Sequence, residues 1–286
     1  TGVTVLAVAL GAVVTAILQS SSATTVMTVG LVNAGLLTLK QAFGIVMGAN
    51  IGTTMTAQLI AFKLTDYVPL VLAIGFAMKA VGKKRTVKNI GQVLLGFGIL
   101  MMGMENMSAS VAPLKDNAKI VDFIAQFSTH PFLGLLVGMT MTMVIQSSGA
   151  TIGILMAMAE QGIIPLDGAI PVLLGDNIGT CITAILAALQ VNLNAKRVAL
   201  SHVLFNFIGS LIAILFMSQF IDFVMKISPE GNIARQIANA HTSFNVINTI
   251  LFIPFTKQFT NLVKALMPGE EEEISLQPKY LNTEVL

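Results

Sequence analysis

Two short polar motifs each occur twice in this 286-residue chain, and the internal spacing is the same in both copies. The first motif is QSSSAT at 19–24, which returns as QSSGAT at 146–151. The second is GANIGT at 48–53, which returns as GDNIGT at 175–180. Each second copy follows the first by 127 residues. Packing alone does not require a common interval, so we predict an internal repeat that places four polar segments around one ligand.

The motifs offer hydroxyls, carboxamides and glycine-freed backbone groups, but they contain no Lys or Arg. An anion bound here must therefore be held by hydroxyl donors and helix N-termini, each of which carries roughly +0.5 of an elementary charge. We expect a helix to begin at each serine cluster and at each threonine of the second motif. The predicted oxyanion ligands are Ser20, Ser21, Ser22, Thr53, Thr54, Ser147, Ser148 and Thr180.

Amide, carbonyl and hydroxyl oxygens are hard ligands that suit a small alkali cation beside the anion. Cations would also offset the charge of a substrate bound without basic side chains, which predicts coupled binding. The expected sodium ligands are Gln19, Thr24, Asn50, Gln146, Thr151, Asp176 and Asn177. We expect no cofactor and no metal other than sodium as the coupling ion.

The composition is that of a membrane protein. Only 10% of the residues are charged, 55% are hydrophobic, and the mean hydropathy is +0.82. A soluble domain normally carries about 25% charged residues. The net charge of +2 is too small to indicate a nucleic-acid partner, and the single cysteine excludes an intrachain disulfide. We predict an all-α, multi-pass protein of the cytoplasmic membrane.

The apolar segments around the motifs predict hairpins and broken helices. Residues 2–18 would span about 26 Å as a helix, which is short for a bilayer crossing. Two such helices meeting at a polar tip favour a re-entrant hairpin, so we predict hairpins over 2–39 and 132–164. The glycines of the second motif predict discontinuous membrane helices over 42–61 and 168–189.

The remaining segments complete two repeats, 1–104 and 131–255. We predict spans at 68–81, 90–104, 198–217 and 234–255, with 90–104 serving as scaffold for the second repeat. Residues 105–130 carry an apolar stripe beside charged side chains, which is typical of an amphipathic helix at the membrane surface. Residues 256–286 are predicted to be a cytoplasmic tail with an acidic linker from Pro268 onward.

Loop charge supports an inverted relation between the repeats. If each hairpin returns to the side from which it entered, Lys40, the cluster 79–88, Lys196, Arg197, Lys257 and Lys264 share one side with the tail. The opposite side mixes basic with acidic residues. The positive-inside rule makes the first side cytoplasmic.

The doubled motifs resemble those of the type II sodium–phosphate cotransporter family, over roughly residues 1–254. The resemblance implies sodium-driven transport of inorganic phosphate through a site formed by both repeats. Bacterial members often have a preceding scaffold helix and a following PhoU-like domain, so we expect this sequence to be part of a longer chain. In the second copy, Gly149, Asp176 and Cys181 replace Ser, Ala and Thr of the first.

Several alternatives stay open at this point. Asp176 is either a cation ligand or a proton acceptor, and hydroxyl donors alone do not distinguish phosphate from sulfate or a dicarboxylate. An intramembrane hydrolase using Ser21 or Ser148 is disfavoured, because neither motif contains a base. The two His-x-x-Phe-Asn sequences beginning at His202 and His241 are interpreted as scaffold packing.

Energetics predict at least two sodium ions per phosphate. Concentrating a dianion ~100-fold against ~100 mV costs about 7.3 kcal/mol, whereas one sodium ion contributes about 3.7 kcal/mol. The transport unit of hairpins and broken helices would slide or rock against the remaining spans. A homodimer is expected because sliding needs a fixed partner surface.

Overall fold

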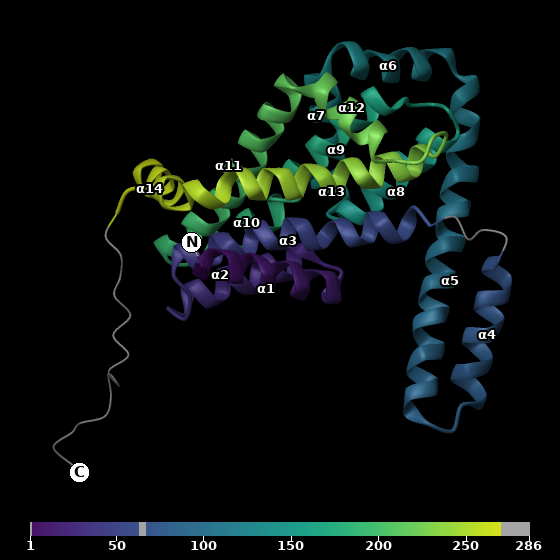
Figure 1. Ribbon diagram of the computed structural model, residues 1–286, viewed down its shortest axis with the longest axis horizontal. Helices are drawn as coiled ribbons and strands as arrows, with labels where there is room; N and C mark the ends of the chain where they lie inside the picture. The colour runs from purple at the N-terminus through teal and green to yellow at the C-terminus, as the bar shows by residue number, and fades with distance from the viewer. Residues whose placement is uncertain (1, 63–66, 270–286) are drawn as a thin grey trace.

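A computed structural model describes residues 2–62 and 67–269, and every regular element in these ranges is helical (Figure 1). Three helical segments are long and apolar enough to cross a membrane: Arg85–Asp116, Leu166–Ala187 and Leu193–Leu215. A fourth crossing is obtained if the pair Ala118–Thr129 and Pro131–Ile145, bent by 114°, counts as one span. The prediction of an all-helical, multi-pass membrane protein is confirmed. The predicted spans 68–81 and 234–255 are not among these segments, and Val68–Val81 is a shorter apolar helix.

Two helices meet at each serine motif. In the first half, α1 (Gly2–Leu18) turns into α2 (Ser21–Asn33), and in the second half, α7 (Pro131–Ile145) turns into α8 (Ser148–Glu160). Gln19 and Gln146 make the two turns with left-handed backbones, φ 54° and 57°. The next serine then caps the following helix in each half through the amide three residues on, at 3.2 and 3.3 Å.

The prediction of a discontinuous helix over 42–61 is wrong, because α3 (Leu39–Ile60) runs through GANIGT without interruption. The polar side chains of the motif bond within the helix. Asn50 Nδ2 donates to the Val46 carbonyl at 2.9 Å, and Thr54 Oγ1 donates to Ile51 at 2.8 Å. Gly48 serves packing, since a Cβ there would overlap the Val8 carbonyl of α1.

The corresponding helix of the second half is interrupted only briefly. α9 (Leu166–Gly179) and α10 (Ile182–Ala187) are separated by Thr180 and Cys181, whose φ values of −60° and −66° remain right-handed. The Cys181 amide bonds to Ile178 at 3.0 Å, which tightens one turn. Gly175 packs against the Leu135 carbonyl of α7, as Gly48 does against α1.

Between the halves, α4 (Val68–Val81) and α5 (Arg85–Val111) form a hairpin that projects from the rest of the molecule (Figure 1). α5 exceeds the predicted span 90–104, and it contacts α8. After η2 (Ala112–Asp116) comes α6 (Ala118–Thr129), the amphipathic helix expected within 105–130. It buries Ile124 and Phe127 and exposes Asp122.

The C-terminal part contains α11 (Leu193–Leu215), α12 (Met217–Lys226), α13 (Ile233–Phe252), η3 (Ile253–Phe255) and α14 (Thr256–Leu266). The prediction that residues 256–286 form a tail is therefore wrong for residues 256–266, which form α14. α14 buries Phe259 and Val263, one helical turn apart, against α3 and α11. The acidic linker expected from Pro268 onward lies outside the described residues after Gly269.

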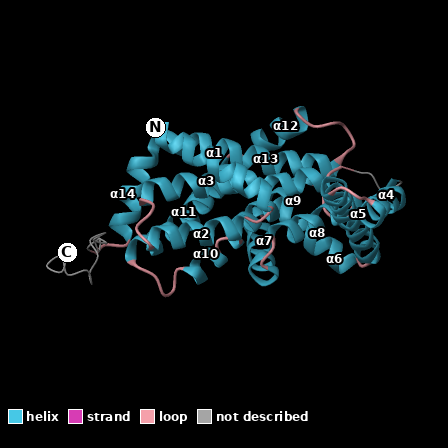
Figure 2. Ribbon diagram, turned by 90° about the horizontal axis from the view of Figure 1, so that it is seen from below, coloured by secondary structure: helices cyan, strands magenta, loops and turns pink. Residues whose placement is uncertain are grey.

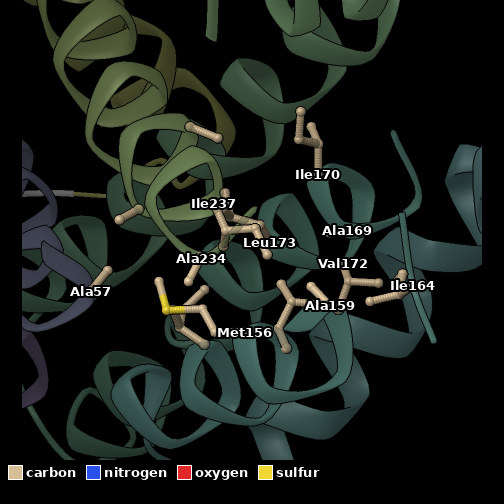
Figure 3. Close-up of a cluster of buried hydrophobic side chains, with 14 of the residues drawn as sticks. Ala57, Met156, Ala159, Ile164, Ala169, Ile170, Val172, Leu173, Ala234 and Ile237 are labelled. Atoms are coloured by element: carbon tan, nitrogen blue, oxygen red, sulfur yellow. The ribbon is translucent and has the colours of Figure 1, made fainter. Parts of the chain in front are cut away.

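The helices pack around two hydrophobic cores, and each core contains residues from both halves. Four phenylalanines from α3, α11, α13 and α14 cluster in the first core: Phe43, Phe205, Phe252 and Phe259. Met156, Leu173 and Ile237 lie in the second core (Figure 3). α13 contacts both α3 and α9, and Figure 2 shows it running beside α3. The two halves are thus joined along α13.

Candidate functional site

The tips of the two hairpins share a cavity of about 440 Å³. One wall comes from α5 through Leu100, Gly103, Met104 and Met107. No described residue of the lining carries a basic side chain, as the motifs predict. The other lining residues are Gln19, Ser20, Ser21, Ser22, Thr53, Thr56, Ile60, Gln146, Ser147, Ser148, Gly149 and Ala150.

Thr53 connects the two hairpin tips. Its Oγ1 accepts from Ser21 Oγ at 3.5 Å and lies 3.4 Å from Ser148 Oγ. Ser21 begins α2, Ser148 begins α8, and Thr53 projects from α3 between them. Three hydroxyls from residues up to 127 positions apart in sequence therefore lie within reach of one small ligand.

A second pair of hydroxyls supports these tips. Thr56 Oγ1 donates to Gln19 Oε1 at 2.9 Å within the first half. Its equivalent, Thr183 in α10, donates to Ser22 Oγ of the first half at 3.1 Å. Sequence reasoning missed both threonines. Their signal is helical spacing, because each follows the last threonine of its GxNIGT motif by three residues and so shares its face.

Thr54 and Thr180 do not line the cavity. The Thr54 hydroxyl bonds to Ile51, and Thr180 Oγ1 donates to the Asp176 carbonyl at 2.9 Å. The expectation that a helix begins at Thr54 is wrong, because Thr54 lies inside α3, whereas Thr180 lies in the short interruption between α9 and α10, two residues before α10 begins at Ile182. The cavity thus faces the N-termini of α2 and α8, two helix ends where the sequence predicted four.

Behind each tip lies a buried hydroxyl pair. Thr15 donates to Thr24 at 2.9 Å in the first half, and Thr142 bonds to Thr151 at 3.0 Å in the second. Only the second half adds a carboxylate, since Thr142 Oγ1 also donates to Asp176 Oδ1 at 2.7 Å. Asp176 is fully buried, and its Oδ2 has no hydrogen-bond partner among the described residues.

The paired asparagines do not line the cavity. Asn177 Nδ2 donates to the Leu173 carbonyl at 3.0 Å, equivalent to the bond from Asn50 to Val46. Asn177 Oδ1 also accepts from Asn245 of α13 at 3.3 Å. The structure therefore brings together the serines, Thr53 and the two glutamines, and it leaves Asn50, Asn177, Thr24, Thr151 and Asp176 behind them.

A duplicated helical membrane fold with a polar cavity between helix breaks is the architecture of a secondary transporter. The chain belongs to the Na+/Pi-cotransporter family, whose model matches residues 1–109 and again residues 110–246. This is a family of transporters and not of enzymes. A following PhoU-like domain stays a prediction.

Relatives of the chain include bacterial and mammalian proteins. The chain is 38% identical to the uncharacterized protein YqeW of Bacillus subtilis, over 76% of this chain and 71% of YqeW. It is 30% identical to the putative inorganic phosphate export protein YjbB of Escherichia coli, over 78% of this chain but only 41% of YjbB. Human sodium-dependent phosphate transport protein 2B is 44% identical over 28% of this chain and 12% of its own length. No solved structure matches the chain.

Proposed function

We propose that the chain is a sodium-coupled symporter that imports inorganic phosphate by alternating access. The observation that carries this proposal is the cavity in which Ser21, Thr53 and Ser148 converge from both halves. Membership in the Na+/Pi-cotransporter family supports the substrate and the coupling ion.

Phosphate would be held by hydroxyl donors and helix ends. The serines at the starts of α2 and α8 line the cavity and would offer their Oγ–H groups. The first-turn amides at the positive dipole ends of both helices would supply further donors. These dipoles act in low dielectric, where they are worth more than in water. Thr53 would donate from the side.

Sodium would supply the charge that the cavity lacks. Gln19 and Gln146 line the cavity and offer amide oxygens beside the phosphate. Asp176, with its unpartnered Oδ2, would hold a second cation together with Thr142 and Thr151. Two or more ions per cycle satisfy the energetic requirement.

The transport direction follows from the sodium gradient in this proposal. An inward sodium gradient drives phosphate inward, whereas the name of the relative YjbB refers to putative export. We propose an inverted relation between the halves, re-entrant hairpins and a cytoplasmic C-terminus, because the basic loops then share the cytoplasmic side. The hairpins with α3, α9 and α10 would move against the remaining helices, within a homodimer.

Radiolabelled phosphate uptake into proteoliposomes tests the proposal. An inward sodium gradient should drive accumulation, and a matched potassium gradient should not. Substitution of Ser21 or Ser148 by Ala should abolish uptake in protein that still elutes as a folded species. Uptake that follows a proton gradient would reassign the coupling ion. Movement of sulfate or succinate without phosphate would contradict the substrate.

A further inference from the structure

Helices α3 and α13 run side by side in opposite directions (Figure 2). Phe43, near the start of α3, lies 6.5 Å from Phe252, at the end of α13, measured between ring centroids. Gln58, near the end of α3, donates to Thr242 in the first half of α13 at 2.9 Å. Aromatic packing therefore joins the two helices at one end, and hydrogen bonds join them at the other.

The aromatic end is closely packed. The phenylalanine cluster, Phe43, Phe205, Phe252 and Phe259, connects α3 with α11, α13 and α14. Phe43 stacks on Phe259 with ring centroids 4.4 Å apart and meets Phe205 edge-on at 5.9 Å, and both Phe43 and Phe205 are fully buried. Separating these rings would lose dispersion contacts that a narrow gap does not restore. We therefore expect the start of α3 to stay in place against α13.

The other end is joined through the side chain of Gln58. Its Nε2 donates to Asn239 Oδ1 at 3.2 Å and to Thr242 Oγ1 at 2.9 Å, and its Oε1 accepts from Arg235 Nη1 at 2.8 Å. The three partners are four and three residues apart, which places them on one face of α13. We call Gln58, Arg235, Asn239 and Thr242 the polar latch.

Arg235 extends the polar latch to the last turn of α3. Its Nη2 donates to the carbonyl of Ala61 at 3.3 Å, and its guanidinium lies over the ring of Phe62, 4.5 Å from the centroid. Ala61 is the C-cap of α3, where carbonyls lack helical partners and the helix dipole is negative. A cation from α13 thus stabilises the end of α3 in this one position.

The acceptors of the polar latch are oriented from within the scaffold. Asn239 Nδ2 donates to Ser228 Oγ at 2.9 Å, in the turn between α12 and α13, and Thr242 Oγ1 donates to the Ala238 carbonyl at 3.1 Å. These bonds do not depend on α3. All four latch side chains are half-buried, so water can replace the bonds to Gln58 when α3 moves away. Opening the polar latch exchanges hydrogen bonds, whereas opening the phenylalanine cluster would lose packing without replacement.

The polar latch lies on the same segment of α3 as the wall of the central cavity. Thr53 and Thr56 line that cavity and precede Gln58 by five and two residues. Measured from Phe43 at 1.5 Å per residue, Thr53 lies about 15 Å and Gln58 about 22 Å along the helix. A rotation of α3 about the phenylalanine cluster would therefore displace the cavity wall and the latch together.

We propose that α3 pivots about the phenylalanine cluster during transport and that the polar latch holds its other end against α13 in one of the two states. The proposal rests on the proposed movement of α3 against the remaining helices. Release of Gln58 lets the Thr53 wall of the cavity move, while the start of α3 stays packed. At the 127-residue interval Gln58 corresponds to Ile185, which has no polar side chain, so the latch acts on the first half alone.

Double electron–electron resonance between pairs of spin labels tests the pivot without a transport assay. The introduced cysteines replace exposed residues, and the native Cys181 is buried and does not take the label. One label pair brackets the polar latch, Met55→Cys with Glu230→Cys. The other pair brackets the phenylalanine cluster, Leu36→Cys with Phe255→Cys.

The polar latch is broken by Gln58→Leu or by Arg235→Gln. Each substitution should broaden the distance distribution of the latch pair about twofold or add a second distance, and it should leave the cluster pair unchanged. Gln41→Leu is the matched control, because Gln41 also lies on α3 but bonds to Thr38 in the helix's own cap. An unchanged latch pair, or equal broadening of both pairs, would overturn the proposal.

Covalent closure of the polar latch connects the pivot with transport. Gln58→Cys and Thr242→Cys would be joined by a short bis-methanethiosulfonate, which dithiothreitol removes. Sodium-driven phosphate uptake should fall at least about tenfold in the joined protein and return on reduction, because a conformational step is blocked. In the control pair, Ser228→Cys with Asn239→Cys, both cysteines lie on the scaffold, and uptake should be the same before and after reduction.

The two assays separate failure of the polar latch from failure of the proposed function. Full uptake by the protein joined at positions 58 and 242 would overturn the pivot. Absence of sodium-driven uptake in every reduced protein, with selective broadening of the latch pair, would reject the proposed function and retain the pivot.

Discussion

The hairpin tips of the two halves have the same backbone conformation, but the residues at and behind them differ. α2 and α8 coincide residue for residue at the 127-residue interval, and both hairpins turn through a left-handed glutamine. The first half has Ser22, Ala49 and a continuous α3, whereas the second has Gly149, Asp176 and a tightened turn at Cys181. The duplication thus conserves the shape of the tips, and the differences confine the buried carboxylate of Asp176 to the second half.

The largest effect is expected from substitutions of the glycines at which helices pack closely, and it should be equal in the two halves. Gly48→Ala and Gly175→Ala each place a Cβ against a backbone carbonyl of the preceding hairpin, which has no room to move. We expect each to destabilise the protein by about 3 kcal/mol, seen as loss of the monodisperse peak in fluorescence-detected size-exclusion chromatography. Gly30→Ala is the control, since a Cβ there meets nothing within 4 Å. A tolerated Gly175→Ala would contradict the equivalence of the two helix pairs.

The next largest effect is expected from loss of the Thr53 hydroxyl, which contacts a serine of each half. Thr53→Val removes the contact with Ser21 and with Ser148 together. Loss of a hydrogen bond to a charged ligand predicts a roughly 10- to 100-fold rise in the KM for phosphate uptake. Thr54→Val is the matched control, because its hydroxyl bonds within α3 and does not line the cavity. Equal effects of the two substitutions would argue against the cavity as the phosphate site.

The carboxylate unique to the second half should control the response to sodium. Asp176→Ala makes this half resemble the first, and we expect half-saturation by sodium to rise about tenfold because an anionic ligand is lost. In wild-type protein, added sodium should raise the Tm by mass action, and Asp176→Ala should reduce this rise. An unchanged sodium response in both assays would remove Asp176 from the coupling site.

The smallest effect is expected from substitutions of Ser22 and Gly149, which occupy the position at which the two tips differ. Ser22→Gly removes the bond from Thr183 and should weaken phosphate uptake about fivefold, in line with ~1 kcal/mol for a neutral hydrogen bond. Gly149→Ser should change uptake less than about threefold, because its Cβ meets only the Thr56 methyl, at 3.1 Å. A larger loss from Gly149→Ser than from Ser22→Gly would mean that the second tip approaches the ligand more closely.

The sequence predicted the parts of this site that depend on periodicity and on polar residues in apolar surroundings. The helical class, the convergence of the serine motifs and the absence of basic residues around the cavity were all accessible in this way. The continuity of α3 could not be predicted in this way. A glycine that breaks a helix and a glycine that lets a neighbouring helix pack closely look alike in sequence. Only the position of the Val8 carbonyl distinguishes the two roles of Gly48.

Thr56 and Thr183 were missed for a related reason. Each lies outside a recognisable motif, and its role depends on a partner that only the fold brings near. α14 was interpreted as tail because its buried face consists of few apolar residues, and its stability comes from the phenylalanine cluster contributed by three other helices. A local sequence pattern does not reveal long-range partners of this kind.

The most direct test of a single phosphate site built by both halves is the stoichiometry of sodium-dependent phosphate binding. Radiolabelled phosphate would be bound to purified wild-type protein and to the Ser21→Ala and Ser148→Ala variants, with binding in choline subtracted. We predict one sodium-dependent phosphate per chain, lost in either variant. Two phosphates per chain, each lost only with the serine of its own half, would show that the halves bind separately and would contradict the account.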